Sequence, residues 1–261
     1  MADGAAPGGR LAGKVAVVTG AAAGFGEGIA RRFCAEGARV LLADLDGENV
    51  EVVAKDLREA GHDAIAAATD VTADADVRRA VGLAVDRWGR VDVMVNNAGI
   101  AQAPTRIEDA TDELFDQLVA VNMYGVFAGC RAVVPVMKAQ GGGVIINTAS
   151  TAAVRPRPLL NLYNASKAFT LNLTKTLALE LAPDRIRVNA INPVMGETGM
   201  LKVFTGEEEM DNDRRAAVVG TIPLGRMSTP DDIAWAAVYL ASDESSLVTG
   251  HGLEVDGGRD V

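Results

Sequence analysis

The sequence predicts a single α/β domain in which a doubly wound parallel sheet carries helices on both faces. Short runs of β-branched and other apolar residues alternate with longer segments whose apolar residues recur at the helical period. The alternation continues along nearly all of the 261 residues, a length that can bury one sizeable core. Because a helix separates each strand from the next, the strands are expected to run parallel and to be covered on both faces.

The first half of the chain alternates four expected strands with three expected helices. The strands are expected at residues 15–19, 40–45, 64–68 and 91–96, and the helices at residues 24–36, 47–60 and 74–88. In the second of these helices, the apolar residues Val50, Val53, Ala54 and Leu57 share one face.

The second half continues the pattern with longer helices. A helix is expected over residues 111–138, bent near Gly125 and Pro135, because both residue types weaken a helix. Pro230 favours the first turn of the last helix, which Ser228 or Thr229 is expected to cap. The other expected elements are helices at 163–182 and 230–241 and strands at 143–150, 186–192 and 252–256.

Two segments depart from the alternation. Residues 1–10 are rich in Ala, Gly and Pro and predict a flexible tail, so the folded domain is expected to span residues 11–261. Residues 194–219 carry several glycines and the acidic run 207–209. A long insertion of this kind beside the ends of the strands is typical of a mobile lid over a substrate site.

The composition argues against several classes of partner. The chain has 35 acidic and 25 basic side chains, a net charge of −10, so nucleic acid and anionic membranes are not expected partners. No apolar run approaches the roughly 20 residues of a membrane span. Cys34 and Cys130 form no CxxC pair, which favours reduced thiols and a cytoplasmic protein. His62 and His251 lack companions at metal-ligand spacing, so no metal site is expected.

A glycine-rich turn after the first strand predicts a dinucleotide site. Gly20 allows a tight exit from the strand, Gly24 lets the backbone approach a pyrophosphate, and Gly26 lets the next helix pack closely on the sheet. The start of that helix, which includes Phe25, offers unpaired N–H groups to the phosphates. A glycine triplet alone is a weak signal, but its place between a strand and a helix favours cofactor binding over a structural turn.

Residues at the ends of the next strands favour NAD over NADP. Asp44 ends the second strand, where a carboxylate accepts both ribose hydroxyls and repels a 2′-phosphate. Asp70 and Val71 follow the third strand and are expected to contact the adenine. The alternatives are that Asp44 caps a helix or is a surface acid and that Asp70 forms a turn. Small and amide residues after the fourth strand are expected to lie against a cofactor ribose, namely Asn97, Ala98 and Gly99.

Four side chains in the second half form a candidate proton-transfer site. Tyr163 and Lys167 are four residues apart on an expected helix and share a face. Because a nearby ammonium stabilises phenolate, Lys167 is expected to lower the pKa of Tyr163, and also to bind a cofactor ribose. Ser150 ends the fifth strand and can orient a substrate oxygen. Asn122, in the middle of a helix, is a candidate for holding a proton-relay water.

Together these motifs resemble the classical short-chain dehydrogenase/reductase family. The matching residues stand in family order from about residue 11 to the C-terminus, and they are Thr19-Gly-x-x-x-Gly24-x-Gly26, Asn96-Asn-Ala-Gly99, Asn122, Ser150, Tyr163-x-x-x-Lys167, Pro193, Thr198, Gly250 and Val255-Asp-Gly-Gly258. The resemblance implies a seven-stranded Rossmann-like sheet, a homotetramer, and Asn122, Ser150, Tyr163 and Lys167 as a catalytic tetrad. It also places Pro193 and Thr198 in the cofactor site. The branches it resembles are the glucose dehydrogenase-like and 3-oxoacyl reductase-like ones.

The chain departs from the family pattern after the sixth strand. The family usually has Pro-Gly there, followed by an Ile or Val that contacts the nicotinamide carboxamide through its backbone. This chain has Pro193-Val194 and then Gly196. The departures predict a lid whose flexibility differs from that of the family.

The loop between Ser150 and Tyr163 carries two arginines next to prolines, Arg155 and Arg157. They are candidates for binding a substrate carboxylate, sulfonate or phosphate, and the alternative is that they are solvated or contact another subunit. Met200 and its apolar neighbours favour a partly apolar pocket.

These features predict an NAD(H)-dependent oxidoreductase that interconverts a secondary alcohol and its carbonyl, with Tyr163 as the acid and base. The alcohol is expected to be cyclic, sugar-derived or anionic. One alternative is a 3-oxoacyl thioester reductase. The other is a non-catalytic, nucleotide-binding regulator, because a fold does not determine a function.

Overall fold

A computed structural model describes residues 9–206 and 210–261 and confirms the doubly wound α/β domain. The strands form one sheet in the order β3-β2-β1-β4-β5-β6-β7, and every neighbouring pair is parallel. They are β1 (Val15–Thr19), β2 (Arg39–Asp44), β3 (Ala64–Ala68), β4 (Val93–Asn96), β5 (Gly143–Thr148), β6 (Ile186–Pro193) and β7 (Gly252–Val255).

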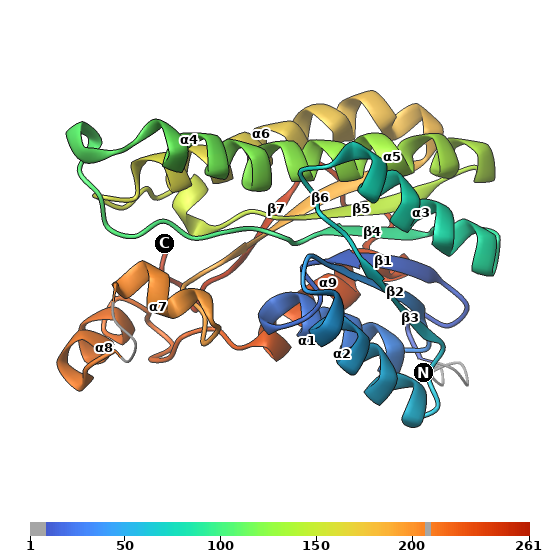
Figure 1. Cartoon of the computed structure of the whole chain (residues 1–261), viewed down its shortest axis with the longest axis horizontal. Helices are drawn as coiled ribbons and strands as arrows, with labels where there is room; N and C mark the ends of the chain where they lie inside the picture. Colours follow the sequence, from blue (N-terminus) through green and yellow to red (C-terminus); the bar gives the residue numbers. More distant parts are fainter. Residues whose placement is uncertain (1–8, 207–209) are drawn as a thin grey trace.

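Helices cover both faces of the sheet (Figure 1). Helices α1, α2 and α9 lie on one face, and α3, α5 and α6 lie on the other. The helices are α1 (Gly24–Ala35), α2 (Gly47–Glu59), α3 (Asp74–Trp88), α4 (Asp112–Leu118), α5 (Gly125–Gln140), α6 (Asn161–Leu181), α7 (Met200–Thr205), α8 (Asn212–Val219) and α9 (Pro230–Ala241). The side chain of Thr229 caps α9.

Strand β1 shows why its sequence is apolar at every position. Val15 and Val17 pack into the core under α3, α5 and α6, whereas Ala16 and Val18 pack into the core under α1 and α9. Side chains alternate between the two faces of a strand. When both faces of the sheet are covered by helices, every side chain is buried, so apolar residues are favoured at every position. The polar residues that remain, such as Thr19, stand at the carboxyl ends of the strands.

The long helix expected over residues 111–138 is three elements. A π-helical turn, Val119–Tyr124, separates α4 from α5, and α5 continues past Pro135 to Gln140. The sequence pattern identified Gly125 as the irregular point, but the irregular turn precedes it. Such turns concentrate at functional sites, and this one contains the fully buried Asn122.

The combined stretch Asp112–Gln140 is long and apolar enough, by length and composition alone, to cross a membrane. The expectation that no run approaches that length is therefore wrong on this criterion. Val126, Val133 and Met137 of α5 are buried in the core against the sheet. A helix in the core of a soluble domain meets the same criterion.

The expected tail and lid are partly described. Residues 1–8 of the tail and the acidic run 207–209 lie outside the described residues. Arg10 is anchored, because its backbone N–H donates to Glu36 Oε2 at 3.0 Å and its guanidinium pairs with Glu244. Arg10, which the sequence pattern assigned to the tail, is therefore held to the folded domain. The expected lid, residues 194–219, carries α7 and α8 in its described part.

Candidate active site

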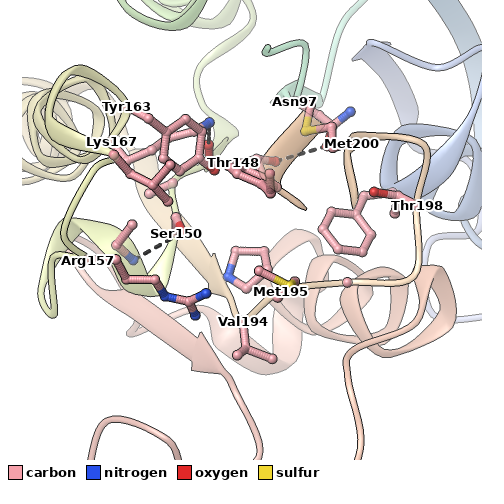
Figure 2. Close-up of a pocket in the computed structure, with 17 residues that line it drawn as sticks. Asn97, Thr148, Ser150, Arg157, Tyr163, Lys167, Val194, Met195, Thr198 and Met200 are labelled. Carbon is pink, nitrogen blue, oxygen red and sulfur yellow. Dashed lines mark hydrogen bonds between the residues drawn. The ribbon is translucent and has the colours of Figure 1, made fainter. Parts of the chain in front are cut away.

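The carboxyl ends of the parallel strands meet at one edge of the sheet, and two cavities lie there, as open α/β sheets predict. We call the first, of about 460 Å³, the cofactor groove. The second, of about 80 Å³, is the catalytic pocket (Figure 2). Phe25, Asn97, Thr198 and Met200 line both cavities, so the two lie side by side and share these residues.

The predicted dinucleotide residues gather around the cofactor groove. Those that line it are Gly20, Gly24, Phe25, Asp44, Asp70, Val71, Asn97, Ala98, Gly99 and Thr198. Met200, which was expected to contact the substrate, lines it too. Pro193, Tyr163 and Lys167 line the catalytic pocket instead. Gly26 lines neither cavity, because it serves packing: an added Cβ there would lie 1.9 Å from the carbonyl oxygen of Gly20.

The start of α1 fits a phosphate group. Side chains cap the first turns of α2, α4 and α9, but no side chain caps α1, whose N-cap is Ala23. No side chain therefore competes for its first N–H groups, and because Gly24 and Phe25 at this end line the groove, a pyrophosphate there can accept from them. Gly24 has φ +59° and adds no side chain to the cradle.

Asp44 is held in place over the glycine turn. Its Oδ2 accepts from the N–H of Ala22 at 2.9 Å, and its Oδ1 accepts from the N–H of Asp46 at 3.0 Å. The helix-capping alternative does not apply, because Asp46 is the residue that caps α2. Asp70 does form a turn, since its Oδ1 accepts from both the N–H and the hydroxyl of Thr72.

Ser150, Tyr163 and Lys167 converge in the catalytic pocket (Figure 2). Ser150 lies beyond β5 and caps a short 3₁₀ turn, because its Oγ accepts from the N–H of Ala152 at 3.1 Å. Tyr163 and Lys167 stand on one face of α6. The ammonium of Lys167 lies 5.7 Å from the centre of the Tyr163 ring and donates to the carbonyl oxygen of Thr148 at 2.9 Å.

Burial controls the proton affinity of both side chains. It raises the pKa of Tyr163 to about 12, against the lowering effects of the Ser150 hydrogen bond and the Arg157 charge. It lowers the pKa of Lys167 to about 8. The expectation of a lowered tyrosine pKa is therefore wrong for this structure, because desolvation of the phenolate outweighs the Ser150 hydrogen bond and the Arg157 charge. At neutral pH, Tyr163 is a neutral phenol beside an ammonium.

Asn122 lies behind the catalytic pocket rather than in its wall. Its Oδ1 accepts from the N–H of Ile100 at 2.8 Å, and its Nδ2 donates to the carbonyl of Ile100 at 3.0 Å and to Ser166 Oγ at 3.2 Å. These bonds occupy the amide, so only the backbone of Asn122 is left for the expected water. The hydroxyl of Thr170 donates to that backbone carbonyl at 3.5 Å.

Several supporting residues could not be identified from spacing. The fully buried Gln102 accepts from the N–H of Tyr163 at 2.8 Å and donates to Asn161 Oδ1 at 3.1 Å, which fixes the start of α6. Thr148 holds Lys167 through a backbone oxygen, for which side-chain identity gives no signal. Phe204 of α7 meets the Tyr163 ring edge-on, with ring centres 5.0 Å apart, and closes the pocket.

Only one of the two loop arginines lines the catalytic pocket. Arg157 lines the catalytic pocket, as does Met200. Arg155 does not line it; its exposed side chain donates to the backbone carbonyl of Arg259. Of the two candidates for an anionic substrate group, only Arg157 is placed to meet one.

The absence of a side chain at Gly196 leaves room for the ring of Phe25. Both line the catalytic pocket, and a Cβ added to Gly196 would lie 2.3 Å from Cζ of Phe25 and 3.0 Å from Oγ of Ser228. The aromatic ring therefore occupies the space that a larger residue at position 196 would need. Two hydrogen bonds hold this segment to Ser228, whose N–H donates to Met195 O and whose Oγ donates to Val194 O.

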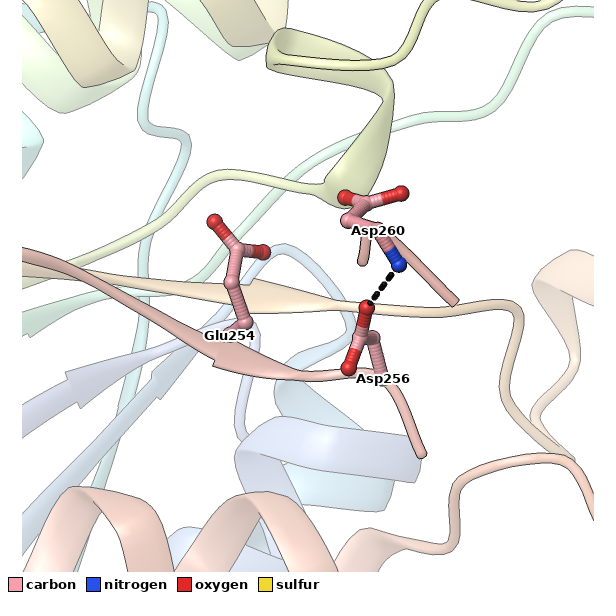
Figure 3. Close-up of side chains that lie close together, drawn as sticks. All are labelled: Glu254, Asp256 and Asp260. Atoms are coloured by element: carbon pink, nitrogen blue, oxygen red, sulfur yellow. Dashed lines mark hydrogen bonds between the residues drawn. The ribbon is translucent and has the colours of Figure 1, made fainter. Parts of the chain in front are cut away.

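A group of three carboxylates lies at the C-terminal end of the chain (Figure 3). Among the described residues, Glu254, Asp256 and Asp260 each place one oxygen within 4.8 Å of the others. Asp256 closes the terminal turn by accepting from the N–H groups of Gly258 and Asp260. Burial, followed by the charge of Asp256, raises the pKa of Asp260. Neither His62 nor His251 belongs to this group.

The contact between Phe25 and position 196 is testable by a double-mutant cycle. Gly196→Val is expected to displace the Phe25 ring from both cavities and to weaken NAD binding roughly fivefold, about 1 kcal/mol. Phe25→Ala in the same chain is expected to restore most of that loss, because it frees the space. Fluorescence titration with NADH measures each variant, and additive effects of the two substitutions would contradict the account.

Comparison with known proteins agrees with this geometry. Residues 20–260 match the sequence model of the family described as enoyl-(acyl carrier protein) reductase. A 4-formylbenzenesulfonate dehydrogenase of Comamonas testosteroni is 44% identical over 95% of this chain and 98% of its own. A D-threitol dehydrogenase of Mycolicibacterium smegmatis is 39% identical over 97% of this chain and 95% of its own.

A solved structure with a similar fold supports the same comparison. The crystal structure of a 3-ketoacyl-(acyl-carrier-protein) reductase from Brucella melitensis, complexed with NADH, has a TM-score of 0.89 and 45% identity. The match covers 96% of this chain and all of that one. With the strand order, the glycine turn and the Ser150–Tyr163–Lys167 cluster, these matches show that the chain belongs to the classical short-chain dehydrogenase/reductase family of oxidoreductases.

Proposed function

We propose that this oxidoreductase uses NAD(H) to interconvert a secondary alcohol and its ketone, with Tyr163 as the proton donor and acceptor. The observation that carries the proposal is that the two cavities lie side by side and share lining residues. Thr198 and Met200 line both the groove and the pocket that holds Tyr163. A dinucleotide that binds from Asp44 along the groove therefore brings its reactive end beside the phenol.

The chain's own residues account for the proton chemistry. A bound nicotinamide supplies or accepts the hydride. For reduction, Ser150 orients the carbonyl oxygen, and Tyr163, with a pKa raised to about 12, holds a proton to donate as negative charge develops there. Lys167 then stabilises the phenolate that remains, because its ammonium lies 5.7 Å from the ring centre. For alcohol oxidation the same groups act in reverse.

Reduction of a 3-oxoacyl thioester is the second candidate. The similar Brucella structure is named as a 3-ketoacyl-(acyl-carrier-protein) reductase, and the same acid/base pair would serve that reaction. The carboxylate of Asp44 lines the groove, where it would repel the 2′-phosphate of NADP, so it bears on the cofactor. It does not separate the two candidates, because the Brucella reductase is itself complexed with NADH. The name of the Comamonas relative adds an aromatic aldehyde to the carbonyl compounds worth assaying.

Substitution of the phenol tests the proton role. Tyr163→Phe keeps the ring that packs against Phe204 but removes the hydroxyl, so turnover is expected to fall by at least about 10²-fold while NADH affinity stays within about twofold. Absorbance at 340 nm over a panel of alcohols, polyols, sugars and ketones measures turnover, and fluorescence titration measures binding. Undiminished turnover in this variant would overturn the mechanism.

Cofactor choice tests the role of Asp44. The wild-type chain is expected to bind NAD at least about tenfold more tightly than NADP, because the Asp44 carboxylate repels the 2′-phosphate. Asp44→Ala should narrow that ratio. Glu48→Gln is the matched control, since this exposed acid stands four residues along and does not line the groove. Tighter NADP binding by the wild-type chain would refute the assignment.

The pH profile tests the role of Lys167. With a pKa lowered to about 8, Lys167 keeps its charge below pH 8 and loses it above, whereas Tyr163 stays protonated to about pH 12. We therefore expect kcat/KM for NADH-dependent ketone reduction to be flat from about pH 6 to 7 and to fall through about pH 8.

Two variants provide the comparison for that profile. Lys167→Met should lose the inflection, and Lys175→Met, which removes an exposed lysine of the same helix, should retain it. A wild-type profile that stays flat to pH 10 would show that the charge on Lys167 does not assist the reaction.

A further inference from the structure

The catalytic pocket contains one charged group that the proton-transfer chemistry does not use. Arg157 comes from the loop between the 3₁₀ turn Thr151–Ala153 and α6, and it lines the pocket with Ser150 and Tyr163. The side-chain amide of Asn164 donates to the Arg157 backbone carbonyl at 2.8 Å, which fixes this part of the loop to α6. Figure 2 shows the guanidinium directed into the cavity, between Ser150 and Met195.

The guanidinium has no ion-pair partner within 4.0 Å in the part of the chain that the structure describes, and its donors make no hydrogen bond there. Burial lowers the pKa of Arg157 to about 10, and the nearby charge of Arg259 acts in the same direction. A group with that pKa is still charged at neutral pH. A partly buried, unpaired cation is unfavourable, so the pocket attracts an anion to this point.

The rest of the pocket wall is largely apolar. The side chains that complete it around Arg157 are Ala152, Leu160, Val194, Met195, Met200 and Phe204. A ligand that matches this wall has a compact apolar body. It presents a carbonyl or hydroxyl to Ser150 and Tyr163 at one end, and it meets the guanidinium at another.

We propose that the substrate carries a carboxylate or sulfonate group and that Arg157 binds it, which makes Arg157 the specificity-determining residue of the pocket. The planar guanidinium presents paired N–H donors that match the two oxygens of such a group. The proposal rests on the proposed function, because it places this anion on the molecule whose carbonyl Tyr163 protonates. Arg155, two residues earlier, stands outside the pocket and provides an internal control.

The competing role for Arg157 is structural. The carboxylate of Asp260 raises the pKa of Arg157, so attraction between the two would hold the C-terminal turn near the loop. In that case, loss of the guanidinium would lower thermal stability and would weaken the binding of neutral and anionic ligands equally. If Arg157 instead binds an anion, loss of the guanidinium removes only the preference for the anionic ligand over the neutral one.

Ligand binding to the NADH complex distinguishes these roles without requiring turnover. Benzoate and its neutral isostere benzamide are titrated by calorimetry into the wild-type, Arg157→Gln, Arg157→Lys and Arg155→Gln proteins, each saturated with NADH. We expect the wild-type protein and Arg155→Gln to bind benzoate at least about tenfold more tightly than benzamide. Arg157→Gln should lose that preference while its benzamide affinity stays within about twofold, and Arg157→Lys should keep part of it.

Each other outcome overturns the proposal. A wild-type protein that binds neither probe or does not prefer benzoate, or an Arg157→Gln protein that keeps the preference, shows that Arg157 is not an anion site. If Arg157→Gln weakens the binding of both probes equally and lowers the Tm, the role of Arg157 is the structural one, through its attraction to Asp260.

The kinetic panel separates this proposal from the proposed function. Tyr163-dependent ketone reduction without a benzoate preference defeats only the anion site. A benzoate preference without turnover of any alcohol or ketone defeats only the proposed function.

Discussion

The buried ammonium of Lys167 is the constraint on which the arrangement of the site depends. The residue is only 4% exposed, and the Thr148 carbonyl oxygen accepts from the ammonium at 2.9 Å. Burial lowers its pKa to about 8 from the ordinary 10.5. Between those two values the unfolded chain binds a proton that the folded chain lacks, so this group's contribution to stability rises with pH in that range. Below pH 8 the fold carries an unfavourable buried charge, which is typical of groups retained for function.

The parallel sheet explains how the partners of that lysine come together. Thr148 ends β5, Asn97 follows β4, and Thr19 ends β1, and all three stand at the same edge of the sheet. The hydroxyl of Thr148 donates to Asn97 Oδ1 at 3.2 Å, and the Asn97 amide donates to the carbonyl of Thr19 at 3.0 Å. The glycine turn that shapes the cofactor groove is thereby linked to the strand that holds Lys167. Groove and pocket are parts of one hydrogen-bonded edge.

The fold and the central site residues could be predicted from the sequence because they follow from short-range patterns. Strand and helix periods, the glycine turn and the four-residue spacing of Tyr163 and Lys167 are visible without tertiary information. The roles of Gln102 and Thr148 are not, because each acts through contacts between residues far apart in the chain. The π-helical turn before Gly125 could not be predicted, because nothing in the local pattern around Asn122 distinguishes a π-helical turn from an α-helical one. The side chains of Arg155 and Arg157 point to different places, and the sequence of a loop does not reveal where its side chains point.

The central claim is that a carbonyl held beside Tyr163 receives a hydride from NADH and a proton from the phenol. Its most direct test supplies NADH deuterated at both C4 positions to the wild-type and Tyr163→Phe proteins with a panel of cyclic, aryl and carboxylate-bearing ketones. The account predicts product alcohols with one deuterium on the carbinol carbon from the wild-type protein, and essentially none from the variant. Products without that label, or equal labelling by both proteins, would contradict it.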